Sequence, residues 1–263
     1  MIGRAFGSRR VFLVGTCLAV GIFLVAPTLV VIPLSFTDQR SFAFPPGGWS
    51  TKWYENFFAD ETWYSSALYS LEVGAIVTIV ATVLGVAGAV GLAHGRGRWR
   101  APVRGMLLAP MIVPGVITAI GIYYVFLRAG LTESLTGFVL AHTVLALPLV
   151  VITVSASLQG LDRQLEWAAA SLGASPWRVF RQVTLPLIVP GIATGALFAF
   201  LTSFDESIVS LFLSGPYART LPIQVYQSVT SEVDPTIAAA STMLVGITVA
   251  LMLILALVSS RKK

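Results

Sequence analysis

The chain has 263 residues, of which 56% are hydrophobic and 11% are charged, and its mean hydropathy is +0.84. Soluble globular domains carry about 25% charged residues, so this composition excludes an ordinary soluble protein and is typical of a polytopic membrane protein. The net charge of +5 comes from basic residues that lie between apolar blocks, which argues against nucleic acid as a partner and favours membrane lipid.

Six apolar segments predict an all-α fold that forms a single transmembrane domain over residues 1–263, because each is long enough to cross about 30 Å of hydrocarbon as a helix. The predicted spans are residues 11–36, 67–93, 105–127, 138–157, 187–213 and 237–258. The first follows a basic start, as in a signal peptide, but it is too long and lacks a small-residue cleavage site, so we expect it to be retained. Gly85, Gly88 and Gly91 give the second span a small-residue strip suited to close helix packing.

The loop after the first span, about residues 37–66, is rich in aromatic side chains. It contains Trp49, Trp53, Tyr54, Phe57, Phe58, Trp63 and Tyr64. This pattern predicts a short amphipathic helix whose rings lie at the membrane interface, and a docking surface for an external partner is the alternative.

The basic residues indicate the orientation of the chain. With six spans, both termini and the loops after spans two and four lie on one side of the membrane. These regions hold most of the 17 basic residues: Arg4, Arg9, Arg10, Arg96, Arg98, Arg100, Arg104, Arg163, Arg178, Arg181, Arg261, Lys262 and Lys263. Because cytoplasmic loops carry the excess of Lys and Arg, we expect both termini and the loop of residues 158–186 to be cytoplasmic.

The cytoplasmic loop of residues 158–186 predicts two short helices. Residues 166–172 favour a helix, and Gly173 fits the position after its end, where a positive φ is needed. Ser175 followed by Pro176 is a favoured start for a second helix, and we expect Pro186 to end it.

This loop resembles the Glu-Ala-Ala loop of permease subunits in binding-protein-dependent ABC importers, which have the type I importer fold. That motif is Glu-Ala-Ala, three residues, Gly, nine residues, then Ile-x-Leu-Pro. With its glycine on Gly173, the motif covers Ala168, Ala169, Val183, Leu185 and Pro186. The motif glutamate falls on Trp167, whereas the acid of this chain, Glu166, lies one residue earlier and about 100° around a helix.

The resemblance implies that the loop is a coupling helix seated on an ATPase subunit. The coupling residues would be Glu166, Trp167, Ala168, Ala169, Gly173, Leu185 and Pro186. It also implies a bacterial inner-membrane location, an ATPase dimer, a periplasmic substrate-binding protein and a second permease subunit, with a heterodimer favoured over a homodimer. The sequence has no Gly-x-x-x-x-Gly-Lys-Ser/Thr pattern, so we expect no cofactor on this chain and ATP with Mg²⁺ on the ATPase.

The segment from Ser203 onwards resembles the second permease subunit of spermidine/putrescine importers. The matching residues are Asp205, Leu213, Gly215, Pro216, Leu221, Pro222, Pro235 and Ala238 to Ser241. This implies a polyamine substrate, and ferric iron, an opine or another small solute remains the alternative. Asp205 and Glu206 at the outer end of span five, with Glu72 in span two, are candidate substrate-path residues, because acids within a membrane are costly and usually functional. Their alternative role is that of solvated residues near helix ends.

Other functional classes lack support in the sequence. His94 and His142 have no second ligand at metal-binding spacing, Cys17 stands alone, and no clustered nucleophile predicts a catalytic site. An ion-coupled secondary transporter would be expected to show inverted repeats or a buried ionisable relay, and neither appears. The sequence therefore predicts a non-catalytic permease.

Overall fold

The computed structural model describes residues 2–95, 97–231 and 234–260, so Arg96 and residues 261–263, which the orientation prediction uses, lie outside it. Within these ranges the chain is helical, apart from loops and an isolated antiparallel bridge between Thr37 and Trp49. The elements are α1 (Ile2–Leu34), α2 (Lys52–Ala59), α3 (Glu61–His94), α4 (Arg100–Leu108), the 3-10 helix η1 (Ala109–Met111), α5 (Gly115–Ala129), α6 (Leu135–Gln159), α7 (Arg163–Ser171), α8 (Pro176–Val179), the π-helix η2 (Phe180–Thr184), α9 (Leu185–Phe204), α10 (Ile208–Leu213), α11 (Leu221–Ser231) and α12 (Thr236–Ser260).

Among the described residues, five helical runs are long and apolar enough to cross a membrane. They are residues 12–34, 61–94, 135–159, 176–204 and 236–254, which correspond to the predicted spans one, two, four, five and six. The third predicted span, 105–127, is not one straight helix, because the chain bends by 100° between Met111 and Gly115. Pro114 explains the break, since it has no N–H to donate and disfavours helical backbone at the residue before it. The bent pair brings the total to six if it counts as one span.

The fifth predicted span, 187–213, has different ends in the structure. α9 stops at Phe204, and the chain becomes helical again only at Ile208, as α10. At the other end, α8, η2 and α9 form a single run that starts at Pro176. The prediction that Pro186 ends the second loop helix is therefore wrong. The wide π turn just before Pro186 relieves the clash between its ring and the carbonyl four residues earlier.

The chain divides into two compact units, and unit 1 comprises residues 1–61 with 227–247. Its α2 is the predicted amphipathic helix, with Trp53 and Phe57 buried. The Trp53 indole donates a hydrogen bond to the Thr37 carbonyl at 2.7 Å, and the Asn56 amide donates to the Thr236 hydroxyl at 2.9 Å. Two rings of the aromatic cluster, Trp53 and Phe57, are thus buried within unit 1.

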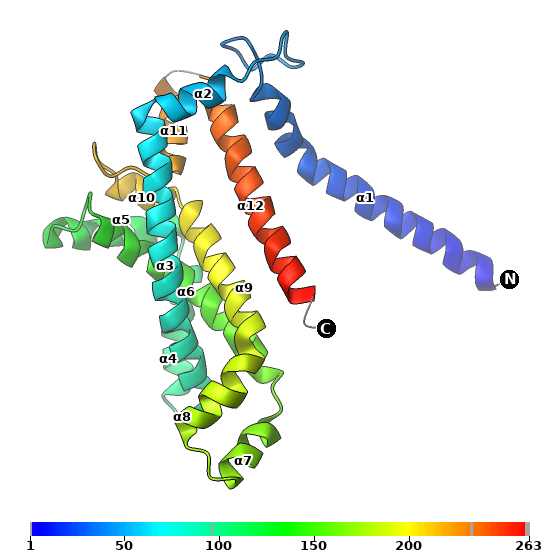
Figure 1. Cartoon of the computed structure of the whole chain (residues 1–263), viewed down its shortest axis with the longest axis vertical. Helices are drawn as coiled ribbons and strands as arrows, with labels where there is room; N and C mark the ends of the chain where they lie inside the picture. The colour runs from blue at the N-terminus through cyan, green and yellow to red at the C-terminus, as the bar shows by residue number, and fades with distance from the viewer. Residues whose placement is uncertain (1, 96, 232–233, 261–263) are drawn as a thin grey trace. The chain divides into compact units, whose positions relative to one another are not determined.

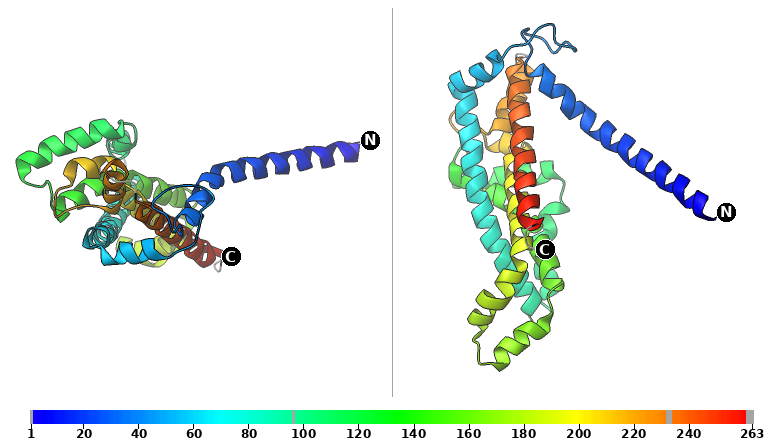
Figure 2. Two further views of the ribbon diagram at one scale, coloured as in Figure 1. Left: turned by 90° about the horizontal axis from the view of Figure 1, so that it is seen from above. Right: turned by 45° about the vertical axis from the view of Figure 1, so that its right-hand side comes forward.

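Unit 2 comprises residues 62–226 with 248–263 and is built around α6. α3 and α9 run alongside α6 (Figures 1 and 2). Glycines permit this close approach: a Cβ on Gly85 would lie 2.6 Å from Val150, and one on Gly195 would lie 2.6 Å from the Thr153 hydroxyl. In the predicted glycine strip of the second span, Gly85 therefore packs closely, whereas Gly91 has no heavy atom within 4 Å of an added Cβ.

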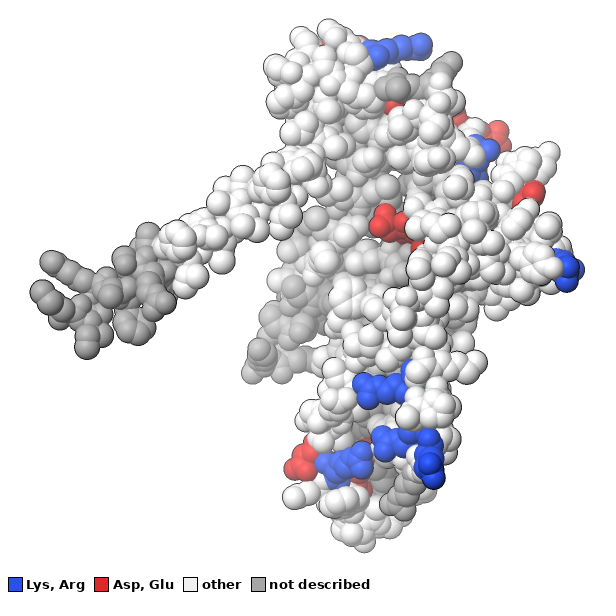
Figure 3. All heavy atoms as spheres, turned by 180° about the vertical axis from the view of Figure 1, so that it is seen from behind, with Lys and Arg blue, Asp and Glu red and all other residues white. Residues whose placement is uncertain are grey.

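The loop between α6 and α9 forms one end of unit 2, where α7 and α8 lie (Figure 1). Blue Lys and Arg side chains gather at this same end (Figure 3). The clustering of positive charge around α7 and α8 agrees with the expectation that the loops after spans two and four share one side.

Candidate functional site

The loop of residues 158–186 has the local structure that its sequence predicts. Asp162 caps the start of α7, because its carboxylate accepts a hydrogen bond from the backbone N–H of Gln164 at 2.9 Å. Gly173 follows the end of α7 with a φ of +83°, and its amide donates to the Ala170 carbonyl at 2.9 Å. Ser175 caps α8 by accepting from the Arg178 amide. Capping satisfies backbone groups that would otherwise be orphaned, so both short helices are well defined.

Glu166 points into the protein and ties the loop to two other helices. Its carboxylate accepts a hydrogen bond from the Thr184 hydroxyl and lies 3.2 Å from His94 Nε2. His94 is the last residue of α3, and Thr184 immediately precedes α9. The Glu166 side chain is 11% exposed and that of His94 is 46% exposed. We term these three residues the loop clamp.

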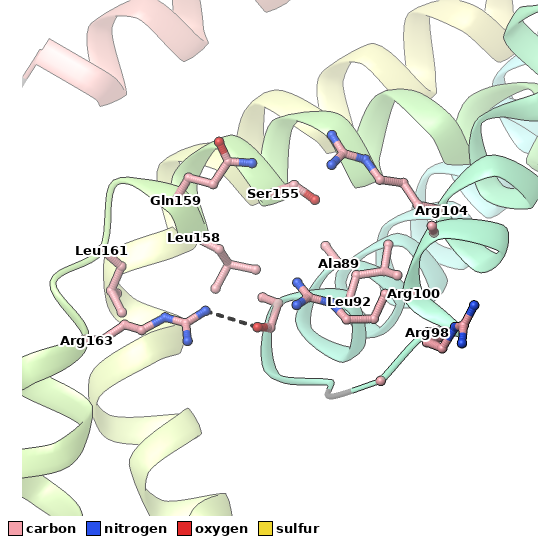
Figure 4. Close-up of a pocket in the computed structure, with 13 residues that line it drawn as sticks. Ala89, Leu92, Arg98, Arg100, Arg104, Ser155, Leu158, Gln159, Leu161 and Arg163 are labelled. Atoms are coloured by element: carbon pink, nitrogen blue, oxygen red, sulfur yellow. Dashed lines mark hydrogen bonds between the residues drawn. The ribbon is translucent and has the colours of Figure 1, made fainter.

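A second contact holds the same loop to α3. The Arg163 guanidinium donates to the Ala93 carbonyl at 3.0 Å (Figure 4). α7 is therefore attached near both its first turn and its middle to the end of α3.

The same loop exposes large apolar side chains. Trp167, at the position of the motif glutamate, is 66% exposed, Leu172 is 89% exposed and Trp177 is 67% exposed. Ala168 and Pro186 are also exposed, whereas Ala169 and Leu185 are half-buried. With the acid displaced by one residue, Glu166 is largely buried and the motif position holds a largely exposed tryptophan.

A second polar cluster lies at the far end of α9. His142 of α6 is fully buried, and its ring nitrogens lie 2.9 Å from the Ser203 hydroxyl and 3.1 Å from the Ser210 hydroxyl. Ser203 belongs to the last turn of α9, and Ser210 belongs to α10. We term these three residues the core clamp, because they join three helices through hydrogen bonds that water does not reach.

Asp205 and Glu206 lie directly after α9. Asp205 is exposed and its carboxylate has no hydrogen bond or ion pair with a described residue, whereas Glu206 accepts from the Val209 amide at 2.9 Å at the start of α10. Glu72 is exposed on α3, and no contact among the described residues joins it to this pair. The structure therefore places Asp205 and Glu206 at a helix break, where a charged group has access to solvent or a path.

Comparison with protein families identifies the chain. Residues 81–263 match the family model described as "Binding-protein-dependent transport system inner membrane component". The chain belongs to this family. It is thus a permease subunit of an ABC importer, a multi-pass inner-membrane protein of a class whose members are transport permeases.

Individual relatives of the permease cover most of its length. It is 36% identical to the putrescine transport system permease protein PotI of Escherichia coli, over 85% of this chain and 82% of that protein. It is 30% identical to the spermidine/putrescine transport system permease protein PotC of Haemophilus influenzae, over 91% and 93% of the two chains. The molybdenum transport system permease protein ModB of Mycobacterium bovis is 34% identical over 72% of this chain and 77% of its own.

Solved structures confirm the predicted fold class. A chain of a bacterial ABC transporter involved in the import of the acidic polysaccharide alginate superposes with a TM-score of 0.71 at 17% identity, covering 96% of the permease and 97% of that chain. At this identity the likeness concerns the fold, which is the all-α architecture of ABC importer permeases.

Sequence analysis missed four features of this site. His94 and Thr184 join the loop clamp, although they lie 72 and 18 residues from Glu166. Leu172 and Trp177 add to the exposed apolar surface. Leu172 and Trp177 could have been found from their hydrophobicity in a loop outside the spans. The contacts of His94 and Thr184 with Glu166 leave no local pattern in the sequence.

Proposed function

We propose that residues 158–186 dock on a separate ATPase subunit and couple ATP hydrolysis to opening of the membrane path. The observation that supports this most directly is the exposure of Trp167, Leu172 and Trp177 on one well-capped loop. A cluster of exposed apolar side chains outside the spans is typical of a protein-binding surface. The proposed coupling residues are Glu166, Trp167, Ala168, Ala169, Gly173, Leu185 and Pro186.

The loop clamp supplies a physical route for coupling. Movement of α7 against the ATPase would pull on His94 at the end of α3 and on Thr184 at the start of α9 through the Glu166 carboxylate. Trp167 takes the place of the motif glutamate and offers an apolar contact, so Glu166 acts within this chain rather than on the partner.

The remaining parts of the importer follow from this assignment. The chain itself binds no cofactor, and ATP with Mg²⁺ binds to an ATPase dimer. A second permease subunit completes the path as a heterodimer, and a periplasmic binding protein delivers the solute. Because basic side chains gather around α7 and α8, this end is cytoplasmic, as are both termini.

A polyamine is the proposed substrate. Relatives named for putrescine and spermidine match over most of the chain, and Asp205 and Glu206 place two carboxylates at the break between α9 and α10. Carboxylates attract ammonium groups most strongly where water is partly excluded. The alternative is that an importer of this class carries another small solute, since one relative is named for molybdenum transport.

Uptake of labelled spermidine by vesicles containing the assembled importer tests this proposal. Wild-type uptake should require ATP and stop with vanadate, which an ion-coupled carrier would not show. Asp205→Asn with Glu206→Gln should reduce uptake by about 30-fold, because each lost carboxylate weakens attraction to a polycation by roughly 1 kcal/mol. ATP hydrolysis stimulated by the binding protein should persist.

The chain offers a matched control for this variant. Asp60 and Glu61 form the same dipeptide at the junction of α2 and α3. Asp60→Asn with Glu61→Gln should leave uptake within about twofold of wild type, since it removes the same two charges from residues that this proposal does not assign to the path. Unchanged uptake in the Asp205 and Glu206 variant would show that the binding protein alone sets selectivity.

A further inference from the structure

A cavity of about 670 Å³ lies beside the loop clamp, between the end of α3, α4, α6 and the start of α7. Four arginines line it, namely Arg98, Arg100, Arg104 and Arg163. Its described lining includes no Asp or Glu. In Figure 4, Arg100 and Arg104 of α4 and Arg163 of α7 surround the space, and Arg98 lies at one edge.

These arginines lack an internal counter-charge. Arg98, Arg100 and Arg104 make no hydrogen bond or ion pair with any residue that the structure describes, and Arg163 uses one donor on the Ala93 carbonyl. A guanidinium has five N–H donors, so most of the donors around this cavity are unoccupied. Like charges brought to one cavity repel unless an anion lies between them, and Arg favours phosphate because its planar fork can bind two oxygens.

A second cavity of about 240 Å³ shares Arg104, Ser155 and Gln159 with the first and continues along α4 and α6. Its other lining is mainly apolar, with Leu108, Val151 and Ile152. An apolar groove that starts at an arginine cluster suits a molecule with an anionic head and a hydrocarbon chain. A free phosphate would make no use of the groove.

We propose that the arginine cavity binds the phosphate of an anionic phospholipid, with one acyl chain in the groove between α4 and α6. The cytoplasmic location of the cavity rests on the proposed function, since the cavity lies at the same end of unit 2 as the loop of residues 158–186. Basic pockets between helices on the cytoplasmic side are suited to anionic headgroups. The bound lipid would neutralise the repulsion between the arginines of α4 and Arg163 of α7. Arg163 itself links α7 to α3 through the Ala93 carbonyl.

Native mass spectrometry of the full-length chain, with the subunits that co-purify, measures this binding directly. Dioleoyl phosphatidylglycerol should bind in preference to dioleoyl phosphatidylcholine. Arg100→Gln with Arg104→Gln should weaken phosphatidylglycerol binding roughly 30-fold, since each arginine near an anionic surface contributes about a factor of five. Arg178→Gln with Arg181→Gln removes the same charge from the same end but outside the cavity, and should change binding by less than about threefold.

Further arms separate the sources of the phosphate and guard against misfolding. Deacylated glycerophosphoglycerol and inorganic phosphate should not displace the lipid at equal concentration. Arg100→Lys with Arg104→Lys keeps the charge but not the planar fork, so it should bind phosphatidylglycerol more weakly than the wild type and more tightly than the glutamine pair. The proposal is overturned if the wild type does not distinguish the two lipids, if both glutamine pairs lose binding equally, or if inorganic phosphate competes. Lipid binding, not uptake, is measured here, so a negative result leaves the coupling proposal intact. Evidence against docking on the ATPase, with lipid binding unchanged, would contradict only the coupling proposal.

Discussion

The loop clamp and the core clamp lie at opposite ends of α9 and use similar groups, but their histidines differ in exposure. The loop clamp holds Thr184, just before α9, to α3 and α7, and the core clamp holds Ser203, in the last turn of α9, to α6 and α10. Each contains one histidine. The His94 side chain is 46% exposed, whereas His142 is fully buried.

This difference decides what each clamp is suited to do. In the loop clamp, water can replace only the contact of His94, because Thr184 is 1% exposed and the Glu166 side chain is 11% exposed. In the core clamp, separation would leave hydroxyl and imidazole groups without partners in an apolar interior, which costs the full desolvation penalty. The core clamp therefore fixes α9 to its neighbours, whereas in the loop clamp only the contact between Glu166 and His94 can open at little cost.

The largest expected difference between the clamps is in stability. His142→Ala removes a buried ring and leaves the Ser203 and Ser210 hydroxyls unpaired, so the free energy of unfolding should fall by about 3 kcal/mol. His94→Ala should cost less than about 1 kcal/mol, because its ring is partly solvated. Denaturant unfolding of the two purified variants in one detergent measures both values. Equal losses would remove the distinction drawn here.

A smaller effect, on transport rather than stability, should distinguish two glycines of the same geometry. Gly173 and Gly130 both follow helices with positive φ, of +83° and +67°, and a Cβ at either meets no heavy atom within 4 Å. Asp at either site adds similar strain of about 1 kcal/mol. Gly173→Asp should reduce uptake by about tenfold or more by placing a charge on the docking surface, whereas Gly130→Asp should stay within about twofold.

Two measurements keep the glycine comparison interpretable. Both variants should reach the membrane at wild-type level, as immunoblots of membrane fractions would show. Gly173→Asn, which tolerates the same backbone without a charge, should recover most of the uptake. Normal uptake by Gly173→Asp would contradict a docking role for the loop.

The smallest expected effect concerns the displaced acid. Glu166→Ala opens the loop clamp and should weaken association with the ATPase by about fivefold, because the loop loses its fixed position. Trp167→Glu removes one apolar contact but restores the family residue, so it should weaken association less than Glu166→Ala does, by about twofold. Co-purification of the tagged ATPase at graded concentrations gives the two values. The reverse order would mean that Trp167, not Glu166, is the residue on which docking depends.

Features set by neighbouring residues could be predicted from the sequence. The turn at Gly173 and the cap at Ser175 depend on backbone preferences within a few positions, and the structure has both. The long apolar runs fixed the number and order of most spans for the same reason. The Glu-Ala-Ala spacing located the loop, because motif spacing is also local.

Features that depend on packing could not be predicted in this way. A proline within an apolar run can bend a helix slightly or break it, and the neighbours decide, so the 100° bend near Pro114 was not foreseen. The direction of Glu166 depends on His94, a residue of a different helix. The contact between Ser203 and His142 likewise joins residues 61 positions apart.

The continuous helical run from Pro176 to Phe204 joins the loop of residues 158–186 directly to the break that holds Asp205 and Glu206. It contains 29 residues, so at about 1.5 Å per residue its ends are roughly 43 Å apart. A tilt of about 5° around the coupling loop would displace the far end by about 4 Å. That end is followed at once by Asp205 and Glu206, so a small rotation at the Pro176 end is sufficient to move two carboxylates by more than the length of a hydrogen bond.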